Sequence, residues 1–235
     1  MILPGSLLVE TPAQGSAIWL CPARDRLGYM NLLLTAATTN SGKLRDFRTA
    51  AQADGLAIES LENLKAIEAP EENGLTFAEN ARIKALYYSQ FAPGKLILAD
   101  DSGLEVDALG GEPGVRSARY AADAGLAPID ENESTDARNN RLLMERVAPI
   151  EAAKRTGRYR CVLVVARNGA MVAEAAGAVE GLILDHLQGS GGFGYDPLFW
   201  LPEFGVTMAE ISLEQKHGLS HRGRALRALL PKLGL

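Results

Sequence analysis

Two adjacent acidic residues, Asp100 and Asp101, are the first candidates for chemistry in this sequence. They follow an apolar segment at 95–99, which predicts a buried strand, and they precede Ser102 and Gly103. Neighbouring strand residues point to opposite faces, so the two carboxylates should have different roles, one binding a metal ion and the other orienting its surroundings. A strand-terminating turn, in which aspartate only caps the backbone, is the alternative.

A second acidic pair, Glu71 and Glu72, precedes Asn73-Gly74. Proteins usually hold Mg²⁺ with one or two carboxylates, while water and substrate phosphate oxygens complete its coordination. Asp101 together with Glu71 or Glu72 would meet that need. The competing interpretation of the two glutamates is solvated loop charge.

A polar loop between an apolar segment at 31–36 and a predicted helix at 43–53 could bind phosphate. Backbone N–H groups and the helix dipole favour an anion at such a helix start, and a lysine there adds positive charge. The loop consists of Thr38, Thr39, Asn40, Ser41, Gly42 and Lys43. It is not a Walker A loop, because Ala37 and Leu44 stand where that motif needs Gly and Ser or Thr. A β-loop-α connection without a ligand is equally compatible with the pattern.

A helix is predicted from Thr76 to about Phe91, because Thr76 and Glu79 have the spacing of a capping box. Asn80 and Lys84 are four residues apart on this helix, and both should therefore reach toward the same ligand. A lysine on a solvated helix face is the alternative.

A glycine-rich segment at 189–197 carries two aromatic rings and a carboxylate. Its central residues are Phe193, Gly194, Tyr195 and Asp196. The rings could stack on a flat base, while the carboxylate could accept a hydrogen bond from the edge of that base. An aromatic-anchored loop without a ligand is the alternative.

Basic side chains gather before and at the start of the last predicted helix, for which Ser220 is a good N-cap. Lys216, His221 and Arg222 belong to this group. Cations at a helix N-terminus oppose the helix dipole, so an anionic partner explains them better than helix stability does. A solvated basic turn is the alternative.

The chain has 235 residues, 47% of them hydrophobic, which is enough for one folding unit with a substantial core. Residues 1–29 lack a helical or strand period and predict a dispensable N-terminal extension or a misassigned start, so that the functional domain would span 30–235. An ordered N-terminal arm is the alternative. Further strands are predicted at 56–61, 161–166 and 171–176. The last two flank Asn168-Gly169, a strong hairpin signal.

A formal net charge of −5 argues against binding to nucleic acid, which requires clustered positive charge. Cys21 and Cys161 form neither a disulfide framework nor a zinc motif. No apolar run approaches the roughly 20 residues that span a membrane, and the start lacks the features of a signal peptide. We therefore expect a cytoplasmic protein without a membrane partner.

In five segments the sequence resembles the inosine triphosphate pyrophosphatase family, and the resemblance runs from about residue 31 to 230. The matching segments, in the family's order, are TTNSGK, GLTFAENARIKA, LADDSGLEVDALGGEPGVRSARYA, GGFGYDPLF and SHRGRAL. The resemblance implies an elongated α/β fold with a mixed sheet flanked by helices, in two lobes with a central active cleft. It also implies a homodimer.

The resemblance further implies that residues 38–43 bind a nucleoside triphosphate and that Asp101, beside Ser102, is the catalytic carboxylate. Asp101 and Glu71 would hold Mg²⁺, with Glu72 as the open alternative to Glu71. The nucleoside pocket would comprise Phe193, Gly194, Tyr195, Asp196, Lys216, His221 and Arg222.

The predicted activity is hydrolysis of the abnormal purine nucleotides ITP, dITP and XTP to the monophosphate and pyrophosphate. Water activated by Asp101 or by the metal would attack the α-phosphorus, and Lys43 and Lys84 would neutralise charge on the leaving group. One alternative is a related pyrophosphatase that acts on other modified nucleotides. Another is a nucleotide sensor without turnover, which the acidic residues disfavour because carboxylates repel phosphate unless a metal intervenes.

Overall fold

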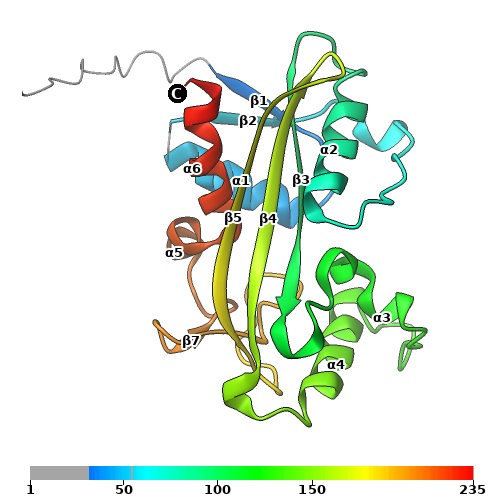
Figure 1. The fold of residues 1–235 in the computed structure, drawn as a ribbon, viewed down its shortest axis with the longest axis vertical. Helices are drawn as coiled ribbons and strands as arrows, with labels where there is room; N and C mark the ends of the chain where they lie inside the picture. Colours follow the sequence, from blue (N-terminus) through cyan, green and yellow to red (C-terminus); the bar gives the residue numbers. More distant parts are fainter. Residues whose placement is uncertain (1–31, 54, 235) are drawn as a thin grey trace, which may run out of the picture.

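A seven-stranded mixed β-sheet runs along the length of the molecule in the order β2-β1-β3-β4-β5-β6-β7 (Figure 1). The computed structural model describes residues 32–53 and 55–234, so the predicted extension at 1–29 lies outside the described residues. Strand β1 is parallel to both β2 and β3, and every later neighbour in the order is antiparallel. The predicted α/β class with a mixed sheet flanked by helices is confirmed.

The strands include the predicted ones and two short additions near the C-terminal end. They are β1 (Leu33–Ala36), β2 (Ala57–Ser60), β3 (Leu96–Val106), β4 (Thr156–Arg167), β5 (Ala170–Ile183), β6 (Phe199–Leu201) and β7 (Val206–Thr207). The helices are α1 (Ser41–Ala53), α2 (Phe77–Tyr88), α3 (Tyr120–Asp123), α4 (Thr135–Val147), α5 (Leu213–Leu219) and α6 (His221–Leu229). No helix among residues 32–53 and 55–234 has the length and apolarity that crossing a membrane requires.

Strand β3 is longer than the sequence predicts. The apolar pattern places its end at Ala99, but the strand continues to Val106, so Asp100 and Asp101 lie in its middle. Its pairing with β1 stops at Leu98, whereas its pairing with β4 continues to Val106. The predicted strand end is wrong because backbone pairing with β4 continues past the acids, which are neutralised by lysines from other elements.

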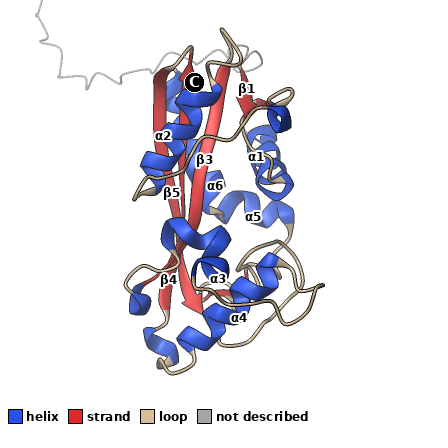
Figure 2. Cartoon of the chain, turned by 90° about the vertical axis from the view of Figure 1, so that its right-hand side faces the viewer, coloured by secondary structure: helices blue, strands red, loops and turns tan. Residues whose placement is uncertain are grey.

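Helices cover both faces of the sheet at the end that contains β1 and β2 (Figures 1 and 2). Helices α1 and α6 pack on one face, where Phe47 and Leu226 join a core cluster with Leu163. Helix α2 packs on the opposite face, where Ala81 and Ala85 allow it to approach the strands closely. Helices α1 and α2 thus lie on opposite sides of β3.

A second core cluster lies at the other end of the long strands, where α3 and α4 pack (Figure 2). Leu143 of α4 meets Tyr159 of β4 and Phe199 of β6 in this cluster. Strands β3, β4 and β5 extend through both clusters and join them. The predicted hairpin between β4 and β5 is confirmed, with positive φ values of 53° at Asn168 and 78° at Gly169.

Candidate active site

A cavity of about 240 Å³ lies where β3 continues beyond the end of β1, between the two core clusters. It collects residues from six separate segments that the sequence singles out. Those that line it are Asn40, Lys43, Glu72, Lys84, Asp101, Ser102, Phe193, Gly194, Tyr195, Asp196 and Arg222. A cavity beside the carboxyl end of a parallel strand is a common position for ligands in α/β proteins.

Asp101 points toward α2 and is 8% exposed. Its Oδ2 atom accepts a hydrogen bond from Asn80 Nδ2 at 3.3 Å, and its Oδ1 atom accepts one from Lys84 Nζ at 3.2 Å. Asn80 and Lys84, which the sequence places on one face of the helix, thus both contact Asp101. Burial raises the pKa of Asp101 above its ordinary value, although the positive charges of Lys84 and Lys43 oppose this rise.

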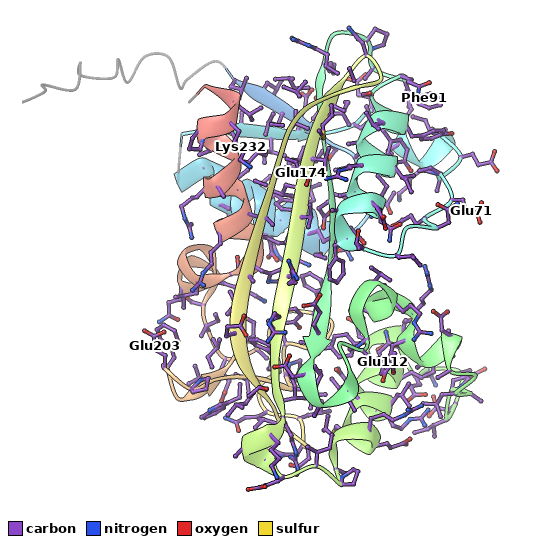
Figure 3. All side chains as sticks on the ribbon, viewed as in Figure 1. Glu71, Phe91, Glu112, Glu174, Glu203 and Lys232 are labelled. Atoms are coloured by element: carbon purple, nitrogen blue, oxygen red, sulfur yellow. The ribbon has the colours of Figure 1, made fainter. Side chains whose placement is uncertain are left out.

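Glu72 belongs to the same ionic cluster, because Lys84 Nζ also donates to its Oε2 atom at 2.8 Å. One ammonium group therefore contacts two carboxylates, those of Glu72 and Asp101. Glu71 is exposed on the outer side of the loop before α2 (Figure 3) and is not among the residues that line the cavity. Of the two glutamates that the sequence offers as metal ligands, the structure brings Glu72 to Asp101.

Asp100 lies on the other face of β3, as the alternation of strand residues predicts. Its Oδ2 atom forms an ion pair with Lys43 Nζ at 2.8 Å and accepts a hydrogen bond from Ser102 Oγ at 3.0 Å. Burial disfavours its charge, but the positive charges of Lys43, Lys84 and Arg222 outweigh burial and lower the pKa of Asp100. Asp100 therefore holds Lys43, while Asp101 faces the cavity.

The loop that the sequence predicts to bind phosphate lies at the start of α1. Asn40 Oδ1 caps the helix by accepting from the backbone N–H of Lys43 at 3.0 Å. A Cβ atom on Gly42 would lie 2.9 Å from the ring of Phe193, so glycine allows this close contact between α1 and the aromatic loop. Thr38, Thr39 and Ser41 lie at the same helix start but are not among the residues that line the cavity.

Helix α4 holds the glycine-rich loop by two hydrogen bonds to Gly194. Asp136 Oδ2 accepts from the backbone N–H of Gly194 at 2.7 Å, and Asn140 Nδ2 donates to its carbonyl oxygen at 3.0 Å. Tyr195 is buried, and its hydroxyl donates to the carbonyl of Ser117 at 2.8 Å. The loop is therefore held immediately after Phe193, which lines the cavity.

Arg222 connects the cavity to α1 and β3. Its guanidinium donates to Asp46 Oδ2 and to Ser102 Oγ, both at 3.1 Å, and lies 5.0 Å from the centre of the Phe193 ring. Burial raises the pKa of Asp46, and Arg222 counteracts that rise. The predicted contact residue Arg222 thus lies at the cavity with its charge paired.

Lys216 and His221 lie behind the cavity wall rather than on it. Lys216 Nζ donates to Asp196 Oδ2 at 2.5 Å, and both side chains are buried. His221 stacks on Tyr159 with ring centres 4.7 Å apart and planes inclined by 11°. Burial lowers the pKa of His221 well below its ordinary value, so the ring is neutral. Both residues support the wall that the ligand would touch.

The sequence did not single out several residues that the structure places at the site. Asp46 lies three residues after Lys43 on α1, and helical spacing could have indicated that both lie on one face. Arg119 lies within the family-like segment that contains Asp101, although no role was assigned to it. Three further residues carried no local signal, because they reach the cavity through long-range packing. They are Asp136, Asn139 and Tyr159.

The fold and cavity define a class of α/β proteins in which a helix start, paired carboxylates and lysines, and an aromatic loop surround one polar cleft. Such a cleft suits a ligand that combines phosphate with a flat ring. The chain belongs to the Ham1 family, whose profile matches residues 34–232.

Similar proteins match over most of their own length. A protein of Acidobacterium capsulatum named dITP/XTP pyrophosphatase is 59% identical over 204 residues, which is 87% of this chain and 99% of that protein. One of the same name from Thermus thermophilus is 47% identical over 194 residues, covering 83% of this chain and 88% of that protein. The solved Ham1 protein of Staphylococcus aureus is 35% identical with a TM-score of 0.68, covering 86% of this chain and 97% of that one.

Proposed function

We propose that this chain is an enzyme that hydrolyses the abnormal purine nucleoside triphosphates ITP, dITP and XTP to the monophosphate and pyrophosphate. The observation that carries the proposal is that one cavity joins Asp101 and Lys84 to the α1 start and to the Phe193–Asp196 loop. Asp101, Lys84 and the α1 start suit the phosphates of a nucleotide, and the Phe193–Asp196 loop suits its base. The names of the relatives from Acidobacterium capsulatum and Thermus thermophilus support the same activity.

We propose Mg²⁺ as the cofactor, with Asp101 and Glu72 as its protein ligands in place of the pair Asp101 and Glu71. Both carboxylates contact one cation, the ammonium of Lys84, so their charges already converge on one point of the cavity. No group of three or more His, Cys, Asp or Glu that could hold a metal ion occurs in the part of the chain that the structure describes. Two carboxylates still fit Mg²⁺, because water and phosphate oxygens usually complete its coordination.

When bound, Mg²⁺ supplies positive charge to the phosphate oxygens and acidifies bound water. Asp101 accepts the proton of the attacking water at its carboxylate, and burial favours this role by raising its pKa. Lys43 and Lys84 stabilise negative charge on the departing pyrophosphate. Asp100 keeps Lys43 in place through the ion pair at 2.8 Å.

The base pocket distinguishes a 6-keto purine from adenine by its hydrogen-bonding edge. Hypoxanthine and xanthine present an acceptor at O6 and a donor at N1, whereas adenine reverses both. Asp196 is suited to accept from N1–H, and the guanidinium of Arg222 or a backbone N–H is suited to donate to O6. Adenine would place its N1 acceptor against the Asp196 carboxylate and its 6-amino donor against the donors for O6, and such mismatched buried contacts are costly.

The test is steady-state kinetics of the full chain with ITP, XTP, GTP and ATP, with and without Mg²⁺, by detection of pyrophosphate. We expect kcat/KM for ITP to exceed that for ATP by at least about 100-fold, and turnover to require Mg²⁺. Comparable turnover of ITP and ATP would contradict the base-edge argument. Preference for a modified pyrimidine or methylated guanine nucleotide would favour a related pyrophosphatase, and tight binding without turnover would favour a sensor.

We also propose that the chain acts as a homodimer in the cytoplasm, as the family resemblance implies. Leu75 is 88% exposed and lines two surface hollows of about 490 and 420 Å³, so it offers apolar surface for such a contact. Light scattering of the purified chain should give roughly twice the chain mass of 25.1 kDa. A mass equal to one chain at micromolar concentration would contradict the dimer.

A further inference from the structure

Tyr159 on β4 is a cavity residue whose ring is fixed from two sides. It is 6% exposed, stacks on His221, and meets Phe199 with ring centres 4.6 Å apart and planes inclined by 39°. These two ring contacts in a buried cluster hold the Tyr159 side chain in one orientation. The position of its hydroxyl group is therefore determined by the packing of the second core cluster.

The hydroxyl of Tyr159 donates to Asp196 Oδ1 at 3.2 Å. Burial raises the pKa of Tyr159 well above its ordinary value, and the adjacent charge of Asp196 adds to this effect. The hydroxyl is therefore protonated near neutral pH. It acts as a donor to this carboxylate.

The hydrogen bonds of Asp196 leave few acceptor positions open. Its Oδ2 atom accepts from Lys216 Nζ at 2.5 Å and from the backbone N–H of Phe193 at 3.0 Å. Each carboxylate oxygen has two lone pairs, so Oδ2 is saturated. The Tyr159 hydroxyl takes one position on Oδ1. Among the contacts of the described residues, one acceptor position remains, and Asp196 lines the cavity.

We propose that Tyr159 is a positioning residue for base recognition, which orients Asp196 so that its one remaining acceptor position receives the N1–H of a 6-keto purine. This inference rests on the proposed function. Without the hydroxyl, Oδ1 would offer two open positions, and water would compete for them. The Asp196 carboxylate would also lose the hydrogen bond from β4 that fixes its orientation.

The role of Tyr159 predicts a loss of binding rather than of chemistry. Asp101, Lys84 and Lys43, which act on the phosphates, have no hydrogen bond or ion pair with Asp196 among the described contacts. A contact made equally in the bound substrate and in the transition state affects KM and leaves kcat unchanged. We therefore expect KM to rise for substrates with an N1 proton, while kcat for these substrates stays unchanged.

The experiment compares the full-length wild type with Tyr159→Phe, which keeps the ring and removes only the hydroxyl. We expect KM for ITP to rise about tenfold with kcat within about twofold, because hydrogen bonds to charged groups are the strong ones. Purine riboside triphosphate lacks both the N1 proton and O6. We expect its KM to change by less than about twofold.

Tyr120→Phe is the matched control, because it also removes a buried tyrosine's hydroxyl, which donates to Glu112 Oε2 at 3.0 Å away from the cavity. Both KM values should be unchanged in this variant. An unchanged KM for ITP in Tyr159→Phe, or equal increases for both substrates, would overturn the inference while the proposed function stands. A wild type without ITP turnover would overturn the proposed function and this inference with it.

Discussion

Asp101→Asn lowers kcat for ITP by about 10⁴-fold, at the upper end of what a general base contributes. Asparagine has nearly the same shape and can still accept from Lys84 through its carbonyl oxygen, but it cannot take a proton from water. It also removes one of the two negative charges that we assign to Mg²⁺. Pyrophosphate release at saturating ITP and Mg²⁺ measures the loss.

The same substitution should leave stability at neutral pH unchanged or increase it. The pKa of Asp101 is raised in the folded protein, so its charged form is less favourable there than in the unfolded chain. The stability that such a group contributes is present at low pH and is lost as pH rises through the folded-state pKa. A neutral side chain removes that loss, so the melting temperature of Asp101→Asn should equal or exceed that of the wild type at pH 7.

The exposed residue Asp130 provides a matched control for Asp101. Asp130→Asn removes the same charge from the protein but should keep kcat within about twofold, because surface charges distant from a site are screened by solvent. Wild-type-like turnover in Asp101→Asn would refute its catalytic role. A large and equal loss in both variants would instead indicate an effect of net charge.

Local signals explain why some elements were predictable. The start of α2 is specified within four residues, since Thr76 Oγ1 accepts from the N–H of Glu79 at 3.2 Å and Glu79 Oε2 accepts from the N–H of Thr76 at 2.9 Å. The hairpin turn likewise depends on the tolerance of Asn168 and Gly169 for positive φ. Both patterns are complete in a short stretch of sequence, so no tertiary information is required.

The path of β3 shows where local signals fail. Its acidic centre looks like the end of a strand, because burying Asp100 and Asp101 would be costly without partners. The partners are Lys43 and Lys84, which come from helices on opposite faces of the sheet. Sequence spacing could suggest that these residues share a site, but it could not show that the strand continues between them.

The cavity wall was unpredictable for a related reason. His221 and Lys216 are not among the residues that line the cavity, and α6, which begins at His221, approaches β5 closely. A Cβ atom on Gly177 would lie 2.4 Å from the carbonyl oxygen of His221, so this glycine sets how closely α6 approaches the strand. Tyr159 reaches the cavity through the same packing, and no motif marked it.

Glu72→Gln lowers kcat/KM for ITP by about 10³-fold at limiting Mg²⁺, because losing a charged ligand removes several kcal/mol of interaction with the metal. Glu71→Gln, the matched control, should stay within about twofold. The two residues are neighbours with identical chemistry, but only Glu72 contacts the Lys84 ammonium that also contacts Asp101. Rates measured as a function of Mg²⁺ concentration separate the two variants.

The dependence on Mg²⁺ also separates two roles of Glu72. If Glu72 holds the metal, excess Mg²⁺ restores most of the rate in Glu72→Gln, because mass action compensates for weaker binding. If Glu72 instead only positions Lys84, the loss persists at every Mg²⁺ concentration. A larger loss in Glu71→Gln than in Glu72→Gln would assign the ligand to Glu71, and the loop before α2 would then have to move inward when Mg²⁺ and the nucleotide bind.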